Sequence, residues 1–210
     1  MCSMLKVSPE INLLSPLSCA ETARGHSYTI WMKSLLFNGC GCTVFDSNGE
    51  IVYRIDNYSM KCRSQVHLMN LQGKVLVSLR RKKLQIFEQW EGFRWTGSGD
   101  RTREKEKPWF QVRRDCRILR RSVSSCHVTF GCDYKAKKKY YRIIGFPERS
   151  EFKIVLGENQ LVAEVKRKQS CGGVVLGKDV LSLKVEALAQ IDHLLIMALV
   201  IVYGLMNDKL

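Results

Sequence analysis

The sequence contains no apolar stretch long enough to cross a bilayer as a helix. Its longest apolar run, residues 194–206, is interrupted only by Gly204. As a helix it would be about 20 Å long, whereas a bilayer core requires about 30 Å. Asp192 and His193 before the run and residues 207–209 after it prevent any extension. Because the run is apolar on every face, it predicts a helix buried in a protein core, with a membrane anchor as the alternative.

A secretory signal is also missing from the N-terminal stretch. Pro9, Glu10 and Pro16 break it up, and no basic cluster precedes an uninterrupted apolar segment. We expect residues 1–25 to form a poorly ordered tail. The nine cysteines, an odd number, are then expected to be free thiols in a reducing cytosolic or nuclear compartment.

Metal-binding and catalytic motifs are lacking as well. Cys40 and Cys42 could supply two metal ligands. Cys126 and His127 could supply two more, but no C-x₂-C pair accompanies them. No Ser or Cys lies in a G-x-S-x-G motif, and His193 is predicted to be a capping or rim residue of the apolar helix. We therefore expect no metal, no cofactor and no catalytic residue, which indicates a non-enzymatic protein.

Residues 172–179, GGVVLGKD, match the first seven positions of the phosphate-binding pattern G-x-x-x-x-G-K-[ST]. Asp179 stands where the pattern has a hydroxyl that binds Mg²⁺, and its charge would repel phosphate. A strand-like segment follows instead of the helix whose N-terminus would hold the phosphate. The sequence therefore does not predict a nucleotide site.

Positive charge exceeds negative charge and is concentrated in two segments. The chain has 34 Lys and Arg against 20 Asp and Glu, a net charge of +14. Residues 80–121 contain 14 basic and 6 acidic residues, and residues 135–168 contain 10 basic and 4 acidic residues. The rest of the chain is balanced, with 10 of each. This distribution predicts an anionic partner, either phospholipid headgroups or nucleic acid, with a merely soluble basic surface as the alternative.

Three basic runs within these segments are the candidate binding residues. Each borders a predicted strand, so alternate side chains point to opposite faces. Near an anionic membrane each Lys or Arg contributes about 1 kcal/mol. No recognition helix, zinc finger or aromatic RNA-binding signature accompanies the runs. The candidates are Arg80, Arg81, Lys82, Lys83, Lys137, Lys138, Lys139, Lys166, Arg167 and Lys168.

Short segments rich in Val, Ile, Phe and Tyr, separated by Gly or Asn, predict an antiparallel β-protein from about residue 26 onward. Hairpins are predicted for residues 42–55, 66–81 and 151–168. In the first two, Asp46 and Asn70 begin the turns, and Gly49 and Gly73 end them, where a positive φ is tolerated. Further strands are predicted at residues 84–90, 108–114, 126–131, 139–146 and 180–187.

The fold must therefore pair the edges of many strands and bury one very apolar helix. A closed antiparallel barrel around the helix satisfies both needs. Closure removes exposed strand edges, and the helix fills a lumen that side chains alone leave empty when a barrel has more than about eight strands. We therefore predict a mainly β (α+β) domain with a central hydrophobic C-terminal helix, and an exposed loop at residues 96–107.

Several blocks of sequence, in order over about residues 26–210, resemble the plant LURP-one-related family. They are WMKSLLFNGCGCTVFDSNGEIVYRIDNY (31–58), LMNLQGKVLVSLRRKKL (68–84), WEGF, PWFQVRR, LVAEVKRKQS and DVLSLKVEALAQIDHLLIMALVIVYGLM. The resemblance implies one domain over residues 26–210 with a Tubby-like fold. That fold, shared with Tubby proteins and phospholipid scramblases, is a closed barrel of twelve antiparallel strands around a central C-terminal helix.

The resemblance implies a function in outline. The family takes its name from a member associated with basal defence, and its superfamily includes proposed membrane-tethered transcription factors and phosphoinositide-binding Tubby proteins. We therefore expect a module that binds anionic membrane lipid or phosphoinositide and regulates plant defence or stress signalling.

Two alternatives stay open. A nucleic-acid-binding transcriptional regulator would need a basic groove along one face, and a scramblase-like lipid-handling protein would need a lumen or cleft for an acyl chain. In each case we expect a monomer without a transmembrane span, located in the cytoplasm, peripherally at the plasma membrane or in the nucleus, with protein partners still to be identified.

Overall fold

A computed structural model of the chain describes residues 25–32, 41–56, 64–82, 88–95, 107–115, 123–131, 140–146, 151–187 and 191–207. These residues form twelve strands and one helix. The strands are β1 His26–Trp31, β2 Gly41–Phe45, β3 Ile51–Asp56, β4 Gln65–Met69, β5 Val75–Arg81, β6 Gln89–Arg94, β7 Phe110–Arg114, β8 Ser124–Phe130, β9 Tyr141–Phe146, β10 Glu151–Leu156, β11 Gln160–Arg167 and β12 Val180–Val185. The helix is α1, His193–Met206.

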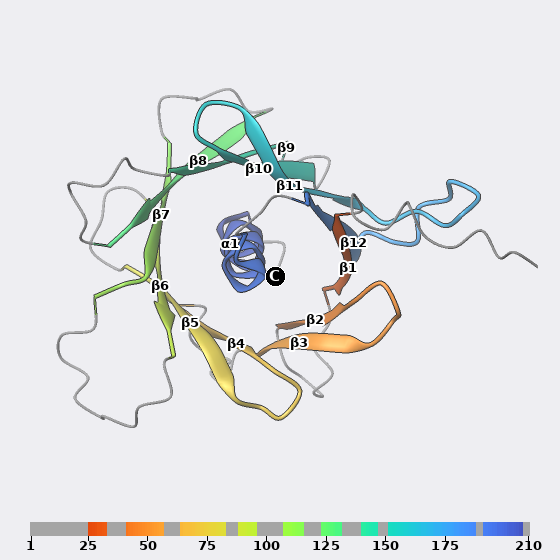
Figure 1. Cartoon of the computed structure of the whole chain (residues 1–210), viewed down its shortest axis with the longest axis horizontal. Coiled ribbons are helices and arrows are strands. Elements are labelled where there is room, and N and C mark those ends of the chain that lie inside the picture. Colours follow the sequence, from red (N-terminus) through yellow and green to blue (C-terminus); the bar gives the residue numbers. More distant parts are fainter. Residues whose placement is uncertain are drawn as a thin grey trace, which may run out of the picture.

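Antiparallel pairing closes the sheet into a barrel. Every strand pairs with its neighbours in the sequence, and β1 also pairs with β12. His26 lies opposite Val185 and Trp31 opposite Val180, so the first and last strands pair over their whole length. Figure 1, which looks along the barrel, shows the strands as a ring around α1. The predicted closed barrel, with the twelve strands that the resemblance implied, is confirmed.

Side chains alternate between the lumen and the outer surface, as the pleat of a strand requires. In β12, for example, Leu181, Leu183 and Val185 are buried, whereas Lys184 points outward and is exposed. Repeated round the barrel, this pattern lines the lumen with apolar side chains. The lumen therefore offers an apolar environment on every side of a central helix.

The helix occupies that environment. In α1 every residue from Leu195 to Met206 is buried except Leu205, which is half-buried. Burying the apolar side chains of such a helix stabilises the fold by about 25 cal/mol for each Å² of apolar surface removed from water. The predicted buried helix is confirmed. No helix in the described part of the chain combines the length and the apolarity that a membrane crossing requires.

Polar groups hold α1 at both ends. At its start, Asp192 Oδ1 accepts two backbone N–H hydrogen bonds from the first turn, at 3.0 and 3.3 Å, and so satisfies donors that a helix leaves unpaired. Asp192 Oδ2 accepts a 2.8 Å hydrogen bond from Arg94 of β6. At its end, Arg114 of β7 donates to the carbonyl of Met206. These hydrogen bonds therefore fix the position of the helix along the barrel axis, in addition to its burial in the lumen.

The two N-terminal hairpins turn as the sequence predicts. Gly49 and Gly73 have φ of +82° and +74°. Asp46 Oδ1 accepts two backbone N–H hydrogen bonds across the first turn, both at 2.9 Å, and Asn70 Oδ1 accepts one across the second, also at 2.9 Å. These side chains and glycines fix the connection of β2 to β3 and of β4 to β5.

One predicted strand is misplaced, whereas the bounds of the others agree within two residues. The prediction put a strand at residues 84–90, but β6 runs on to Arg94, and residues 84–87 lie outside the described part. The prediction stopped early because Gly92 interrupts the apolar pattern. A Cβ at Gly92 would overlap the Phe110 ring, so glycine lets this ring pack against the backbone of β6. The predicted tail and the loop at 96–107 also fall almost wholly outside the described residues.

Candidate functional site

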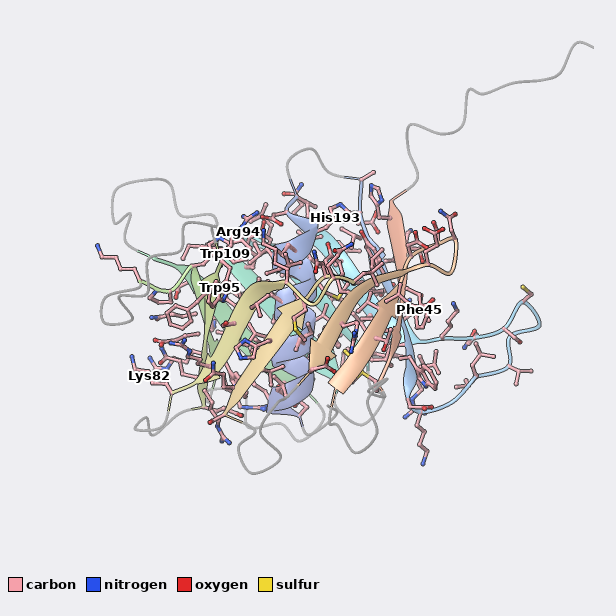
Figure 2. The ribbon with its side chains drawn as sticks, turned by 90° about the horizontal axis from the view of Figure 1, so that it is seen from below. Phe45, Lys82, Arg94, Trp95, Trp109 and His193 are labelled. Atoms are coloured by element: carbon pink, nitrogen blue, oxygen red, sulfur yellow. The ribbon has the colours of Figure 1, made fainter. Side chains whose placement is uncertain are left out.

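The helix gives the barrel two distinct ends. It begins beside Arg94, at the end of β6, and ends beside Arg114, at the end of β7. We call these the entry end and the exit end. Because the strands alternate in direction, β5 and β11 both finish at the exit end. In Figure 2, His193 lies at one end of the barrel and Lys82 at the other.

Three predicted binding residues lie where β5 finishes, and each has a close partner. The Arg80 guanidinium lies over a phenylalanine ring of β6, 4.8 Å from its centroid. Arg81 is 3.6 Å from Glu88, and Lys82 is 3.4 Å from Glu91. With side chains 53% and 45% exposed, these two basic residues form surface ion pairs of about 0–1 kcal/mol each. Carboxylates therefore offset much of the charge on this wall.

Three further predicted residues lie where β11 finishes. Lys166 is 56% exposed, and its Nζ is 2.7 Å from Glu164. The hydrogen bond from Lys166 is the main cause that lowers the pKa of Glu164. The Nε of Arg167 is buried, with no hydrogen-bond partner in the described structure. Lys168 donates to Thr29 of β1, which ties this wall to the neighbouring strands.

The two basic groups lie on opposite walls of the barrel. Five strands separate β5 from β11 in either direction round the ring (Figure 1). A helix about 10 Å across lies between the two walls, and this distance exceeds the screening length of about 8 Å at physiological salt. The structure therefore does not bring the described candidates into one patch. Lys83, Lys137, Lys138 and Lys139 lie outside the described residues.

A hairpin that we call the arm, residues 168–179, leaves the wall between β11 and β12. Backbone hydrogen bonds order it: Lys168 N donates to Val180 O at 2.9 Å, Leu176 N to Lys168 O at 3.0 Å, and Ser170 N to Val174 O at 2.8 Å. Figures 1 and 2 both show the arm projecting away from the barrel. Strand β12 follows the arm, whereas a phosphate-binding loop is followed by a helix. The strand predicted after residues 172–179 is therefore present.

The outer part of the arm is apolar and exposed. Val174, Val175 and Leu176 are 67%, 46% and 53% exposed, and Cys171 is exposed beside them. Sequence analysis missed this feature. The signal was present, because the three apolar residues lie between a Gly-Gly pair and Gly177, but an apolar run of that length reads equally well as part of a buried strand.

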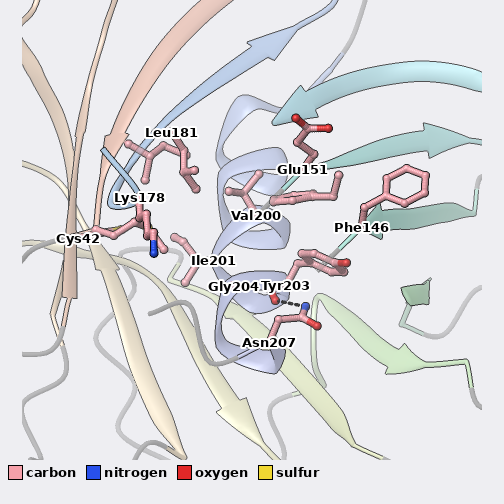
Figure 3. Close-up of a pocket in the computed structure, with 13 residues that line it drawn as sticks. Cys42, Phe146, Glu151, Lys178, Leu181, Val200, Ile201, Tyr203, Gly204 and Asn207 are labelled. Carbon is pink, nitrogen blue, oxygen red and sulfur yellow. Dashed lines mark hydrogen bonds between the residues drawn. The ribbon is translucent and has the colours of Figure 1, made fainter. Parts of the chain in front are cut away.

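An apolar cavity lies between the C-terminal half of α1 and the barrel wall (Figure 3). Val200, Ile201 and Tyr203 form its helix side, and Asn207 at its end donates a 2.7 Å hydrogen bond to the Tyr203 carbonyl. Lys178 of the arm also contributes to the lining. Its volume is about 50 Å³, whereas an apolar cavity of about 150 Å³ holds one benzene ring. An acyl chain therefore does not fit within this space.

The entry end carries a small cluster of polar aromatic side chains. Tyr28 Oη and His193 Nδ1 are 2.9 Å apart, and the His26 and His193 rings meet edge to face at 4.5 Å. Burial, and next the proximity of His26, lower the pKa of His193, while Asp192 opposes the shift. Asp192 is the cap, and His193 lies at the rim, which agrees with the prediction of a capping or rim role for His193.

The buried cysteines are not nucleophiles. Burial raises the pKa of the Cys126 thiol to about 12 and also raises that of Cys42, so both are fully protonated at neutral pH. Across the described ranges, no three His, Cys, Asp or Glu side chains come close enough together to hold a metal ion. Cys40 lies outside these ranges.

Comparison with known proteins gives a family match. The family model described as LURP-one-related matches residues 26–204. Among curated Arabidopsis thaliana proteins, Protein LURP-one-related 11 is 42% identical over 98% of this chain and 90% of its own length. Protein LURP-one-related 3 is 45% identical over 90% of this chain and 83% of its own length.

A solved structure supports the fold independently. The X-ray structure of a protein from Arabidopsis thaliana superposes with a TM-score of 0.57, covering 89% of this chain and 94% of that one at 18% identity. At that identity the likeness concerns the fold alone.

Proposed function

The chain belongs to the LURP-one-related family, and on that premise we propose that it is a non-enzymatic, Tubby-like module that binds anionic phospholipid at a membrane surface. The observation that carries the proposal is the basic root of the arm. Lys166, Arg167 and Lys168 enter the arm from β11, and Lys178 leaves it toward β12. Phospholipid headgroups are the anions that such a protruding basic surface fits.

The charge balance of this wall leaves basic side chains available to another anion. Lys166 and Lys178 are exposed, and Glu164 and Asp179 are the carboxylates closest to them in sequence. Glu164 already lies 3.2 Å from Lys153 as well as close to Lys166, so Lys166 retains part of its charge for another anion. On the β5 wall, Lys82 pairs with Glu91, and Glu88 is shared by Arg81 and Arg114.

The expected affinity from charge alone is low. At about 1 kcal/mol for each Lys or Arg near an anionic leaflet, the four basic residues at the arm root supply about 4 kcal/mol. This corresponds to a dissociation constant of about 1 mM. Binding of this strength is readily reversible, so in our proposal the protein is a releasable regulator that needs a second contact to stay on the membrane.

We base the proposed biological setting on the family resemblance. We place the protein in the cytoplasm and peripherally at the plasma membrane or in the nucleus, as a membrane-tethered regulator of plant defence or stress signalling. A nucleic-acid partner is the second candidate. It is less favoured because the described basic groups face away from each other, whereas a duplex needs a continuous basic groove.

The test is sedimentation of the purified full-length protein with phosphatidylcholine vesicles, alone or mixed with phosphatidylserine or a phosphoinositide. We expect binding only to the anionic vesicles and a marked loss of binding between low and physiological salt. The double variant Lys166→Gln/Lys178→Gln should bind about thirtyfold more weakly, given about 1 kcal/mol for each of the two charges removed.

Two matched controls remove charge elsewhere. Lys184→Gln removes an exposed lysine near the other end of β12, and Lys82→Gln removes one on the opposite wall. Both should bind like the wild type. Equal losses for each charge removed, in all three variants, would indicate a diffuse effect of net charge and contradict a binding wall. Failure of the wild type to bind any anionic vesicle, with salt-sensitive binding to DNA or RNA instead, would favour the nucleic-acid candidate.

A further inference from the structure

The arm carries two features that together match the cross-section of a bilayer leaflet. Its outer part exposes three consecutive apolar side chains, Val174, Val175 and Leu176. Its root carries exposed Lys166 and Lys178. From Gln169 to Gly177 the arm has no charged side chain. Exposed apolar residues are unfavourable in water unless a partner covers them, and a cluster of them marks an interaction surface.

The dimensions of the arm agree with those of a leaflet. Val175 pairs with Gln169, and from Lys166 to Gln169 the chain advances three residues, or about 10 Å when extended. The polar layer of a leaflet is about 5–8 Å deep, half the difference between the whole bilayer and its hydrocarbon core. With Lys166 at the phosphates, Val175 would therefore reach the acyl chains, at the depth that interfacial segments occupy.

The arm is also built to hold its shape. Ser170 Oγ accepts a 3.2 Å hydrogen bond from the backbone N–H of Val174, and Gly173 N donates to Ser170 O at 2.9 Å. Gly173 has a φ of +78°, which glycine adopts without strain. A closed turn that satisfies several of its own backbone groups enters an apolar layer at lower cost than an open loop.

We propose that the arm is a membrane-insertion hairpin: its tip, residues 174–176, enters the acyl boundary of an anionic leaflet while Lys166 and Lys178 contact the phosphates. The inference rests on the proposed lipid binding and supplies the second contact that charge alone leaves missing. Single weak signals give only marginal membrane binding, whereas an apolar and an electrostatic signal together give stable anchoring. The basic root selects a bilayer over a second copy of this chain, because each copy carries the same positive charge.

The first experiment compares the full-length wild type with Val174→Ser/Leu176→Ser on vesicles of phosphatidylcholine and phosphatidylserine. The matched control is Leu71→Ser, which removes an apolar side chain 51% exposed in the β4–β5 hairpin at the entry end. The double variant should bind about tenfold more weakly, because it removes apolar area that insertion would bury. The control should bind like the wild type, and all three proteins should show the same thermal midpoint.

The second experiment measures depth. Val175→Trp and the control Leu71→Trp are mixed with anionic vesicles whose acyl chains carry bromine, which quenches tryptophan at close range. Relative to the wild type, Val175→Trp should add a quenched, blue-shifted component, whereas Leu71→Trp should add an unquenched one.

The outcomes separate the two proposals. If the wild type binds anionic vesicles but the arm double variant binds equally well and Val175→Trp is not quenched, the arm does not insert, and the lipid-binding function stands without it. If the wild type binds no anionic vesicle, the function itself fails, and insertion fails with it. If the wild type self-associates in the absence of vesicles and the double variant does not, the tip is a contact between copies, and insertion is overturned.

Discussion

Arg94 donates a 2.8 Å hydrogen bond to Asp192, the residue that caps α1, so a strand residue of the barrel is tied to the start of the helix 98 positions later. One Asp192 oxygen serves the helix and the other serves the barrel. The position of the helix along the barrel axis therefore depends on this carboxylate at one end and on Arg114 at the other.

Asp192→Ala should lower the free energy of unfolding by about 1–2 kcal/mol, mostly through the lost cap, because the partly exposed ion pair contributes about 0–1 kcal/mol. Asp192→Asn keeps the capping oxygen and should cost less than half as much. Urea denaturation of both variants measures the difference. Equal losses in the two would mean that the ion pair, not the cap, matters here.

Leu199→Asp should abolish folding of the domain. Leu199 has no exposed surface, and an unpaired carboxylate in that position has neither water nor a partner, which costs several kcal/mol. Circular dichroism and solubility are the measurements. The control is Leu71→Asp, the same substitution at an exposed leucine, and it should fold normally. A folded Leu199→Asp protein that loses only membrane association would contradict the assignment of α1 to the barrel core.

The barrel and its helix were predictable because their signals are local. Alternating apolar residues mark the strands, Asx and Gly mark the turns at Asp46 and Asn70, and residues 194–206 are apolar on every face. Closure was a weaker inference from the residues themselves. The pairing of His26 with Val185 joins the two ends of the domain, and no local pattern in either strand specifies that register.

The candidate site was predictable only as a set of residues. Sequence located Lys166 and Lys82, but which wall each occupies depends on strand order round the barrel, and their carboxylate partners depend on cross-strand register. The arm tip was missed for a related reason. Val175 and Leu176 look like strand residues, and only the fold shows that none of the described elements covers them.

Gly145→Ala should destabilise the barrel by about 1–3 kcal/mol, the usual cost of overpacking. A Cβ at Gly145 of β9 would overlap the hydroxyl of Tyr203 in α1 and lie 2.7 Å from the Cβ of Phe152. The helix and the wall would have to move apart. Gly172→Ala in the arm is the matched control, since a Cβ there meets only one side-chain oxygen, at 3.9 Å. Thermal melts of the two variants should differ clearly, and identical melts would show that Tyr203 can shift freely.

Cys171 should react with a thiol reagent much faster than Cys42 or Cys126. Cys171 is exposed on the arm, whereas burial raises the pKa of the other two thiols and shields them from solvent. In a timed reaction with a maleimide, Cys171→Ala should lose one rapidly labelled thiol relative to the wild type, and Cys42→Ala should lose none. Mass spectrometry of the labelled peptides identifies the sites, and fast labelling of Cys42 in the folded protein would contradict its burial.

Stability should fall as the solution is acidified from about pH 7.5 to about pH 5.5, a range around the ordinary histidine value of about 6.5. Burial and the nearby His26 lower the pKa of His193, and burial and Arg80 lower the pKa of His67. Below about pH 6.5 the two histidines therefore bind protons more readily in the unfolded chain than in the folded one. Their contribution to stability is complete above that pH and is lost as the pH falls through their pKa values in the folded state. This range lies above the ordinary pKa values of carboxylates, so histidines account for the change.

Thermal midpoints across the range should decline less in His67→Gln/His193→Gln than in the wild type, and NMR titration of the imidazole signals should place both pKa values below 6.5. A wild-type midpoint that is constant across the range would mean that neither imidazole is shielded from water in the folded barrel.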